Sequence, residues 1–271
     1  MIKLIIYRNS YILRKNNVSL NKFILNIKKS PTIFVGGGEY LEINYKDKTY
    51  KYKKCEDTEY YVLFSQDKNK YECASVIISK EDKLAEVHGI SNYTSCLQNT
   101  NENVGSHLLQ ITLKMLKKYS SKLGINKISL TDNSIKKCGR TNIILSKMLI
   151  LLSGHTWYGK YNFRPYDIYE NKINEFMNEK YENNIKIMDT ITIKKANLLE
   201  YIKITNNTKL INELSKLLEI QPDMLLKKYI KKLLNNYDNK CKYFTMFYEK
   251  LFSDIGLHDF NKQAFVLHLF H

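Results

Sequence analysis

Residues 100–106 combine features that suit the binding of a pyrophosphate group. Their sequence is Thr100-Asn101-Glu102-Asn103-Val104-Gly105-Ser106. This polar loop opens a segment with helical spacing, and a helix N-terminus presents unpaired backbone N–H groups together with the positive end of the helix dipole. Gly105 allows the backbone to approach a ligand closely, and Ser106 can cap the helix or donate its hydroxyl. The loop is therefore a candidate phosphate-binding site.

Three other side chains could carry acid–base chemistry. Glu86 and His88 lie two positions apart on a strand-like segment, so they share one face, where either could remove a proton. Tyr158 lies in a later aromatic segment and could donate a proton. Structural explanations stay open for all three. Glu86 can be a solvated strand residue and His88 a packed one, which is the simpler interpretation, and Tyr158 can be an amphipathic core residue.

Other features carry weaker signals. The three glycines at 36–38 are better explained as a hairpin turn than as a phosphate cradle. Three histidines are too loosely spaced for a zinc site, and the C-terminus that holds them is expected to fray: His258, His268 and His271. The lysine-rich stretch 227–232 indicates a solvated helix face, although together with Tyr229 and Tyr237 it could contact nucleic acid. Cys96 could be an acylated nucleophile, but no clear base accompanies it.

The elements that must position these residues follow from hydrophobic periodicity. Strands are predicted at 40–45, 60–64, 73–79, 84–90 and 125–130, with the first paired across the glycines to 32–35 and the next three forming an antiparallel meander. Helices are predicted at 108–119 and 141–152, and residues 164–169 are extended in character. Beyond about residue 170 the pattern is helical and charged.

The order strand, loop, helix, strand, helix and aromatic segment resembles the GNAT family of N-acetyltransferases over roughly residues 59–169. The family's phosphate loop reads (Arg/Gln)-x-x-Gly-x-(Gly/Ala), followed by a small residue and a Leu-Leu pair. Gly105 and the pair Leu108-Leu109 match this pattern, whereas Thr100 replaces the Arg or Gln and Asn103 replaces the first glycine. Asparagine tolerates the left-handed conformation better than most residues, but the loss of the Arg removes one phosphate contact.

A second family element has the form Leu-Tyr-x-x-x-Gly-Phe. Tyr158 and Phe163 match it here, and Asn162 replaces the glycine. The resemblance implies that Thr100–Ser106 binds acetyl-CoA as a substrate, in a cleft between the strands at 84–90 and 125–130. It further implies that Tyr158 protonates the departing coenzyme A thiolate. Glu86 or His88 would accept the proton of a primary amine, directly or through water.

The expected fold is therefore α/β (α+β), with a GNAT-like mixed, mostly antiparallel central sheet that is flanked by helices. A mainly helical C-terminal region follows the sheet. We predict an acyl-CoA-binding domain at 1–175, in which 1–58 has no assigned role, and a helical region at 176–271.

Composition allows a competing function. The 271 residues carry a formal net charge of +16, with 43 Lys and Arg against 27 Asp and Glu. Such a surface permits binding to nucleic acid as well as to coenzyme A. The heavy use of Lys, Asn, Ile and Tyr indicates an AT-rich genome, such as that of a large DNA virus or of an AT-rich unicellular organism. The alternative is thus a catalytically inactive GNAT-like protein that serves as a structural or nucleic-acid-binding component.

The cysteines and the apolar runs bear on compartment. The five cysteines are odd in number and contain no C-x-x-C pair, so free thiols in a reducing compartment are expected, without a metal site. The N-terminus lacks the features of a signal peptide, and no apolar run approaches ~20 residues. These observations predict a cytoplasmic protein (host cytoplasm or virion if viral) with no membrane partner.

Overall fold

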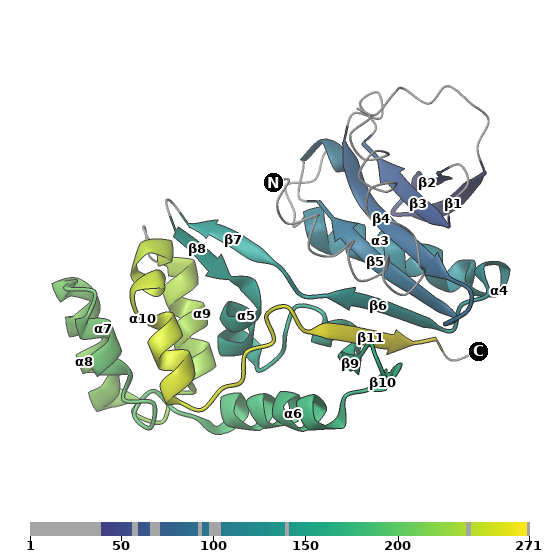
Figure 1. Ribbon diagram of the computed structural model, residues 1–271. Coiled ribbons are helices and arrows are strands. Elements are labelled where there is room, and N and C mark those ends of the chain that lie inside the picture. Colours follow the sequence, from purple (N-terminus) through teal and green to yellow (C-terminus); the bar gives the residue numbers. More distant parts are fainter. Residues whose placement is uncertain are drawn as a thin grey trace, which may run out of the picture. The chain divides into compact units, whose positions relative to one another are not determined.

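A nine-stranded sheet forms the centre of the protein, in the order β1-β2-β3-β4-β5-β6-β11-β9-β10 (Figure 1). The computed structural model describes residues 39–55, 59–65, 71–91, 94–97, 104–138, 141–236 and 240–269. From Tyr40 onward these residues belong to one unit. The predicted strand at 32–35 and the glycines at 36–38 lie outside the described residues.

All neighbouring strands of the large sheet pair antiparallel except β5 and β6, which are parallel. The strands of the large sheet are β1 (Tyr40–Tyr45), β2 (Lys48–Lys54), β3 (Tyr60–Phe64), β4 (Glu72–Ser79), β5 (Leu84–Ile90), β6 (Lys127–Thr131), β9 (Arg164–Asp167), β10 (Lys172–Ile173) and β11 (Ala264–His268). A separate hairpin consists of β7 (Ile135–Cys138) and β8 (Thr141–Ile144). The predicted mixed, mostly antiparallel sheet is confirmed.

Eight α-helices in the described part of the chain flank this sheet. They are α3 (Val104–Lys118), α4 (Ser120–Leu123), α5 (Leu145–Ser153), α6 (Glu175–Thr190), α7 (Leu198–Lys203), α8 (Thr208–Ile220), α9 (Leu226–Asn236) and α10 (Lys240–Asp254). Two short 3-10 turns are η1 (Thr94–Cys96) and η2 (Gly159–Tyr161). Five of the α-helices, α6 to α10, follow one another between β10 and β11, so the predicted helical C-terminal region is confirmed. The predicted domain boundary falls at the start of α6.

The first hairpin of the described residues uses a strand, β2, that the sequence did not predict. β1 pairs with β2 through a two-residue turn in which Lys46 and Asp47 have φ values of 47° and 61°. Such left-handed turns suit the twist of a two-residue hairpin. In the lysine-rich β2, Tyr50 and Tyr52 alternate with exposed residues and are 7% and 0% exposed. The strand is therefore recognisable only by its alternating tyrosines.

One part of the hydrophobic core lies between the sheet and α3, the helix that joins the two parallel strands. The buried face of α3 includes Leu108, Leu109 and Ile111, all with no exposed surface. Apolar residues recur along α3 at helical spacing, as the sequence predicted. The short helix α4, which follows α3, ends at Gly124, and this glycine takes the left-handed conformation with φ 67°.

The chain returns to the sheet after the helices. β11 lies between β6 and β9 and pairs antiparallel with both, and in Figure 1 β6 and β11 run side by side. The expectation that the C-terminus frays is therefore wrong for residues 264–268, because this short apolar run is an interior strand. Residues 141–152 also differ from the prediction, since the helix begins only at Leu145, after β8.

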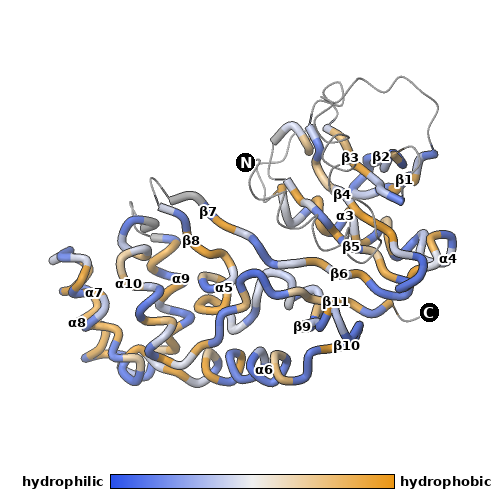
Figure 2. Tube along the Cα trace, in the orientation of Figure 1, coloured by the Kyte–Doolittle hydropathy of each residue, from blue (hydrophilic) through white to orange (hydrophobic). Residues whose placement is uncertain are grey.

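The helices between β10 and β11 are amphipathic. Hydrophilic and hydrophobic residues alternate along α8 and α9 in Figure 2, and Leu210, Leu214, Leu226 and Ile230 have no exposed surface. Asn184 of α6 fixes the chain that leads into β11. Its side-chain amide donates to the carbonyl of His258 and accepts a hydrogen bond from the backbone N–H of His258, each at 2.8 Å. The helices are thus attached to the sheet by a buried polar contact as well as by apolar packing.

One pair of cysteines contradicts the prediction of free thiols. Cys73 of β4 and Cys96 of η1 form a disulfide with a Cα–Cα distance of 5.6 Å. The antiparallel β4–β5 hairpin explains the pairing, since the N–H of Ser91, directly after β5, donates to the carbonyl of Cys73 at 2.8 Å. Cys96 is therefore not a nucleophile in this structure. Cys55 is not part of a disulfide.

Candidate functional site

The parallel strands β5 and β6 are hydrogen-bonded over only part of their length. Their ladder runs from Leu84↔Lys127 to Val87↔Leu130. Residues 88–90 of β5 extend beyond it. Because β5 and β6 run in the same direction, both carboxyl ends lie at this edge of the sheet, where ligands bind in many α/β proteins.

A β-bulge interrupts β5 at the same point. Ser75 of β4 pairs with Gly89, and the next residue of β4, Val76, pairs with Val87, so His88 is the extra residue. A bulge leaves the extra residue without a ladder partner and turns its side chain, and bulges are frequent beside functional sites. The bulge therefore gives His88 an orientation that simple alternation does not set.

The first turn of α3 lies beside the end of β5 and the Trp157 ring. A Cβ atom added to Gly105 would lie 3.2 Å from Cη2 of Trp157 and 4.0 Å from Cγ2 of Ile90. The indole Nε1 of Trp157 donates to the hydroxyl of Ser106 at 3.3 Å. Val104 to Ser106 are helical, whereas Thr100 to Asn103 lie outside the described residues. The structure thus joins the end of the predicted phosphate loop to the predicted aromatic segment.

Tyr158 lies in an aromatic cluster on the face of the sheet that α3 covers. Its ring centroid is 5.1 Å from that of Trp157, 6.2 Å from Phe163 and 6.3 Å from Phe265. Phe265 pairs with Leu130, which pairs with Val87, and residues opposite one another share a face. Tyr158 is 7% exposed and therefore packed, and its neighbour in the chain, Trp157, contacts the first turn of α3.

Glu86 and His88 lie on the opposite face. Glu86 alternates along β5 with the buried Ala85 and Val87. Its partner on β4 is Ile77, which in turn pairs with Tyr60 of β3. The His88 ring lies edge-on to the Tyr60 ring at a centroid distance of 6.4 Å. The structure therefore brings Glu86 and His88 together on one face and places Tyr158 on the other.

Polar residues around His88 were missed by the sequence analysis. The Tyr60 hydroxyl donates to Oε1 of Glu72 at 3.0 Å. Burial, and next the nearby Glu72 carboxylate, raise the pKa of Tyr60 well above its ordinary value. His88 Nδ1 is buried and has no hydrogen-bond partner among the described residues. Such an atom needs an explanation, and a ligand is one. The feature that could have revealed these residues is that Tyr60 and Glu86 share one face of the sheet. This is visible only once the pairing of β3, β4 and β5 is known.

A second missed residue follows β6. Asp132 has no exposed surface, and its Oδ1 accepts hydrogen bonds from the N–H of Ser134 at 3.2 Å and from its hydroxyl at 2.5 Å. Burial raises the pKa of Asp132, and the bonds from Ser134 only partly oppose this rise. Its Oδ2 is buried without a hydrogen-bond partner in the described structure.

Helix α6 supports the aromatic segment from outside. The Tyr181 hydroxyl lies against Gly159, where a Cβ atom would overlap it and would lie 2.8 Å from Cζ. The same hydroxyl is 2.8 Å from Nδ1 of His155. Burial raises the pKa of Tyr181 to about 12 and, with the nearby Arg164, lowers that of His155, so a neutral pair is favoured. Gly159 is therefore needed for close approach of α6.

Two other kinds of feature are absent from the residues that the structure describes. Within these ranges no group of three or more His, Cys, Asp or Glu side chains is arranged to hold a metal ion. None of the helices that the structure describes is long and apolar enough to cross a membrane.

Comparison of the chain with family models, with curated protein sequences and with solved structures gives no match.

Proposed function

We propose that the protein is a GNAT-like N-acetyltransferase that transfers an acetyl group from acetyl-CoA to a primary amine. One observation carries the proposal: the β5–α3–β6 unit, whose ladder ends at Val87↔Leu130, has the α3 N-terminus and Tyr158 at that same end. The pyrophosphate of the cofactor would be bound by the first N–H groups of α3 around Gly105, with Thr100 to Asn103 completing the loop.

The placement of the candidate acid and bases on opposite faces supports this proposal. Beyond Val87↔Leu130 no ladder pairing joins β5 to β6, so a thioester between them could be approached from either face. Tyr158 would protonate the departing thiolate from the α3 side. His88, or Glu86, would accept the proton of the amine from the other side, directly or through water. His88 is favoured by its unpaired buried Nδ1.

Binding of acetyl-CoA tests the proposal directly. Acetyl-CoA should raise the Tm in a saturable way, because a ligand at 100 times its Kd stabilises the folded state by roughly 2.7 kcal/mol. Release of free coenzyme A thiol should then be followed in the presence of a panel of amines. Absence of any Tm shift at millimolar acetyl-CoA contradicts the proposal.

The competing function predicts a different result. A catalytically inactive, nucleic-acid-binding component, for instance of a virion, is favoured by the charge of +16 and by Thr100 and Asn103 at the family's Arg and Gly positions. A gel shift with DNA or RNA that weakens steeply with salt and does not respond to acetyl-CoA would support it.

A further inference from the structure

A cavity of about 510 Å³ lies at the other end of α3, away from Gly105. It is bounded by Lys117 of α3, by Asn162 and Arg164 at the start of β9, and by Leu267 and Leu269 at the end of β11. Lys117 follows Gly105 by twelve residues, which places it roughly 18 Å further along the helix. The cavity is therefore separate from the proposed acetyl-CoA site, and its volume is in the range of small-molecule sites.

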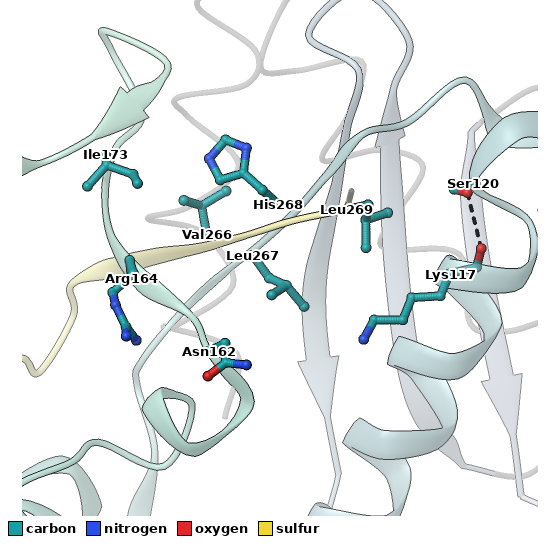
Figure 3. Close-up of a pocket in the computed structure, with 9 residues that line it drawn as sticks. All are labelled: Lys117, Ser120, Asn162, Arg164, Ile173, Val266, Leu267, His268 and Leu269. Carbon is teal, nitrogen blue, oxygen red and sulfur yellow. Dashed lines mark hydrogen bonds between the residues drawn. The ribbon is translucent and has the colours of Figure 1, made fainter. Parts of the chain in front are cut away.

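Three of the polar residues that line the cavity share one side of β11. Figure 3 shows Lys117, Asn162, Arg164 and Leu267 on one side of the strand, whereas His268 and Ile173 point to the other. Lys117 projects from the α3 wall, and Arg164 and Asn162 come from the facing wall. No Asp or Glu is among the described residues that line the cavity.

The two cations differ in how they are held. Arg164 donates from Nη1 to the carbonyl of Phe163 at 3.2 Å, lies over the Tyr181 ring, and has its Nε 3.8 Å from Oε1 of Glu182. These contacts fix the guanidinium, and Glu182 offsets part of its charge. The Lys117 ammonium has no hydrogen bond or ion pair with any residue that the structure describes. Lys117 lies in the last turn of α3, where the negative end of the helix dipole attracts its charge.

We propose that this cavity binds a small molecule that carries one carboxylate or phosphate group on a short apolar body. The anionic group lies between Lys117 and Arg164 and accepts a hydrogen bond from the Asn162 amide. The apolar body covers Leu267 and Leu269. Lys117 supplies most of the attraction, because its charge is not offset by a neighbouring carboxylate.

Calorimetric titration with octanoate and with hexyl phosphate tests this site, with 1-hexanol as the neutral probe. Both anions should bind in a saturable way, hexanol should not, and saturating acetyl-CoA should leave the binding unchanged. Lys117→Gln should weaken binding by about tenfold, as expected for loss of one charged contact. The matched control is Lys216→Gln, which removes the same charge from the exposed face of α8 and should have no effect.

A second variant keeps the test independent of folding. Asn162 has a φ of 67°, so Asn162→Gly preserves the backbone and removes only the amide. It should weaken both anions while leaving the Tm close to that of the wild type. Three results would each overturn the proposal. They are no anion binding at several millimolar, anion binding by Lys117→Gln as tight as by the wild type, and displacement of the anion by acetyl-CoA. Binding of one anion but not the other identifies the preferred headgroup.

Discussion

The two ends of α3 offer different groups to a ligand. At the N-terminal end the candidate donors are backbone N–H groups, and the surrounding side chains of Trp157 and Ile90 are apolar. At the C-terminal end the backbone presents carbonyl groups, and the positive charge comes from the side chains of Lys117 and Arg164. If both ends bind anions as proposed, recognition at the first end would depend on how precisely the backbone is held, and recognition at the second on individual side chains.

This difference predicts different responses to mutation. Changes that shift the first turn of α3, or the residues packed against it, should impair acetyl-CoA binding even where they touch no ligand. Side-chain changes at Lys117 should act on the other site alone.

Loss of the Cys73–Cys96 disulfide should have the largest effect on stability. The bond closes a loop with a sequence separation of 23 residues, and a loop of this size is expected to contribute about 3 kcal/mol. Cys96→Ser, or reduction with dithiothreitol, should lower the Tm and weaken acetyl-CoA binding, because Cys96 tethers the chain that leads into α3. Cys55→Ser is the matched control. An unchanged Tm after verified reduction would show that the tether is not needed.

Tyr158→Phe should have the next largest effect, on turnover. It keeps the ring against Trp157 and Phe265 and removes only the hydroxyl. Acetyl transfer at saturating acetyl-CoA should fall by about a hundredfold, at the lower end of what general acids contribute. Acetyl-CoA affinity and Tm should change little. If turnover is retained, Tyr158 is a packing residue and the acid is another group.

Gly159→Ala should destabilise the support behind Tyr158 by about 2 kcal/mol, through overpacking against Tyr181. The Tyr181 hydroxyl is held by His155, so it cannot simply move aside. The control is the free energy of unfolding of the double variant, which carries both Gly159→Ala and Tyr181→Phe. Without the hydroxyl, the ring atom Cζ at position 181 would still lie 2.8 Å from the new Cβ atom. Tyr181→Phe should therefore recover only part of the stability that Gly159→Ala removes. No coupling between the two changes would contradict this contact.

Trp157→Phe should weaken acetyl-CoA binding by about fivefold, close to the value of one lost hydrogen bond. The change removes the donor to Ser106 and leaves an aromatic ring beside Gly105. Titration with octanoate provides the control, because the cavity at Lys117 should be unaffected. Equal losses at both sites would show that the two ends of α3 are not independent.

The smallest expected effect is a pH-dependent gain from Asp132→Asn. Burial raises the pKa of Asp132 in the folded state, so its contribution to stability is present at low pH and is lost as the pH rises through that raised pKa. The asparagine does not titrate. Its Tm should therefore exceed that of the wild type by about 2 °C near neutral pH, on the order of 1 kcal/mol or less. The difference should vanish in acid, and a constant difference at all pH values would contradict this assignment.

Local patterns predicted the elements with strong periodicity. The strands at 60–64, 73–79 and 84–90 and the helix α3 were recognisable because alternating or helically spaced apolar residues are set by burial on one face. β2 was missed because its lysines obscure two buried tyrosines. The bulge at His88 was also missed, since a bulge is defined by the partner strand and not by the strand itself.

Contacts between distant segments were beyond the sequence analysis. Cys73 and Cys96 looked unrelated because nothing in their spacing shows that the β4–β5 hairpin brings them together. The contact of Tyr181 with Gly159 joins a helix to a turn in the same way. Tyr60 and Glu72 gave no signal as neighbours of His88, because their proximity depends on strand register.

The sequence by itself determined the mixed α/β class, the meander, and the strand–helix–strand order that places Gly105 at the start of a helix. These follow from burial of regularly spaced apolar residues, which is a local property. Only the tertiary structure decided that the β5–β6 ladder ends at Val87↔Leu130, that the run at 264–268 is an interior strand, and that the C-terminal end of α3 faces a cationic cavity. Each of these depends on hydrogen bonds or charges contributed by segments far apart in the chain, and local spacing does not encode them.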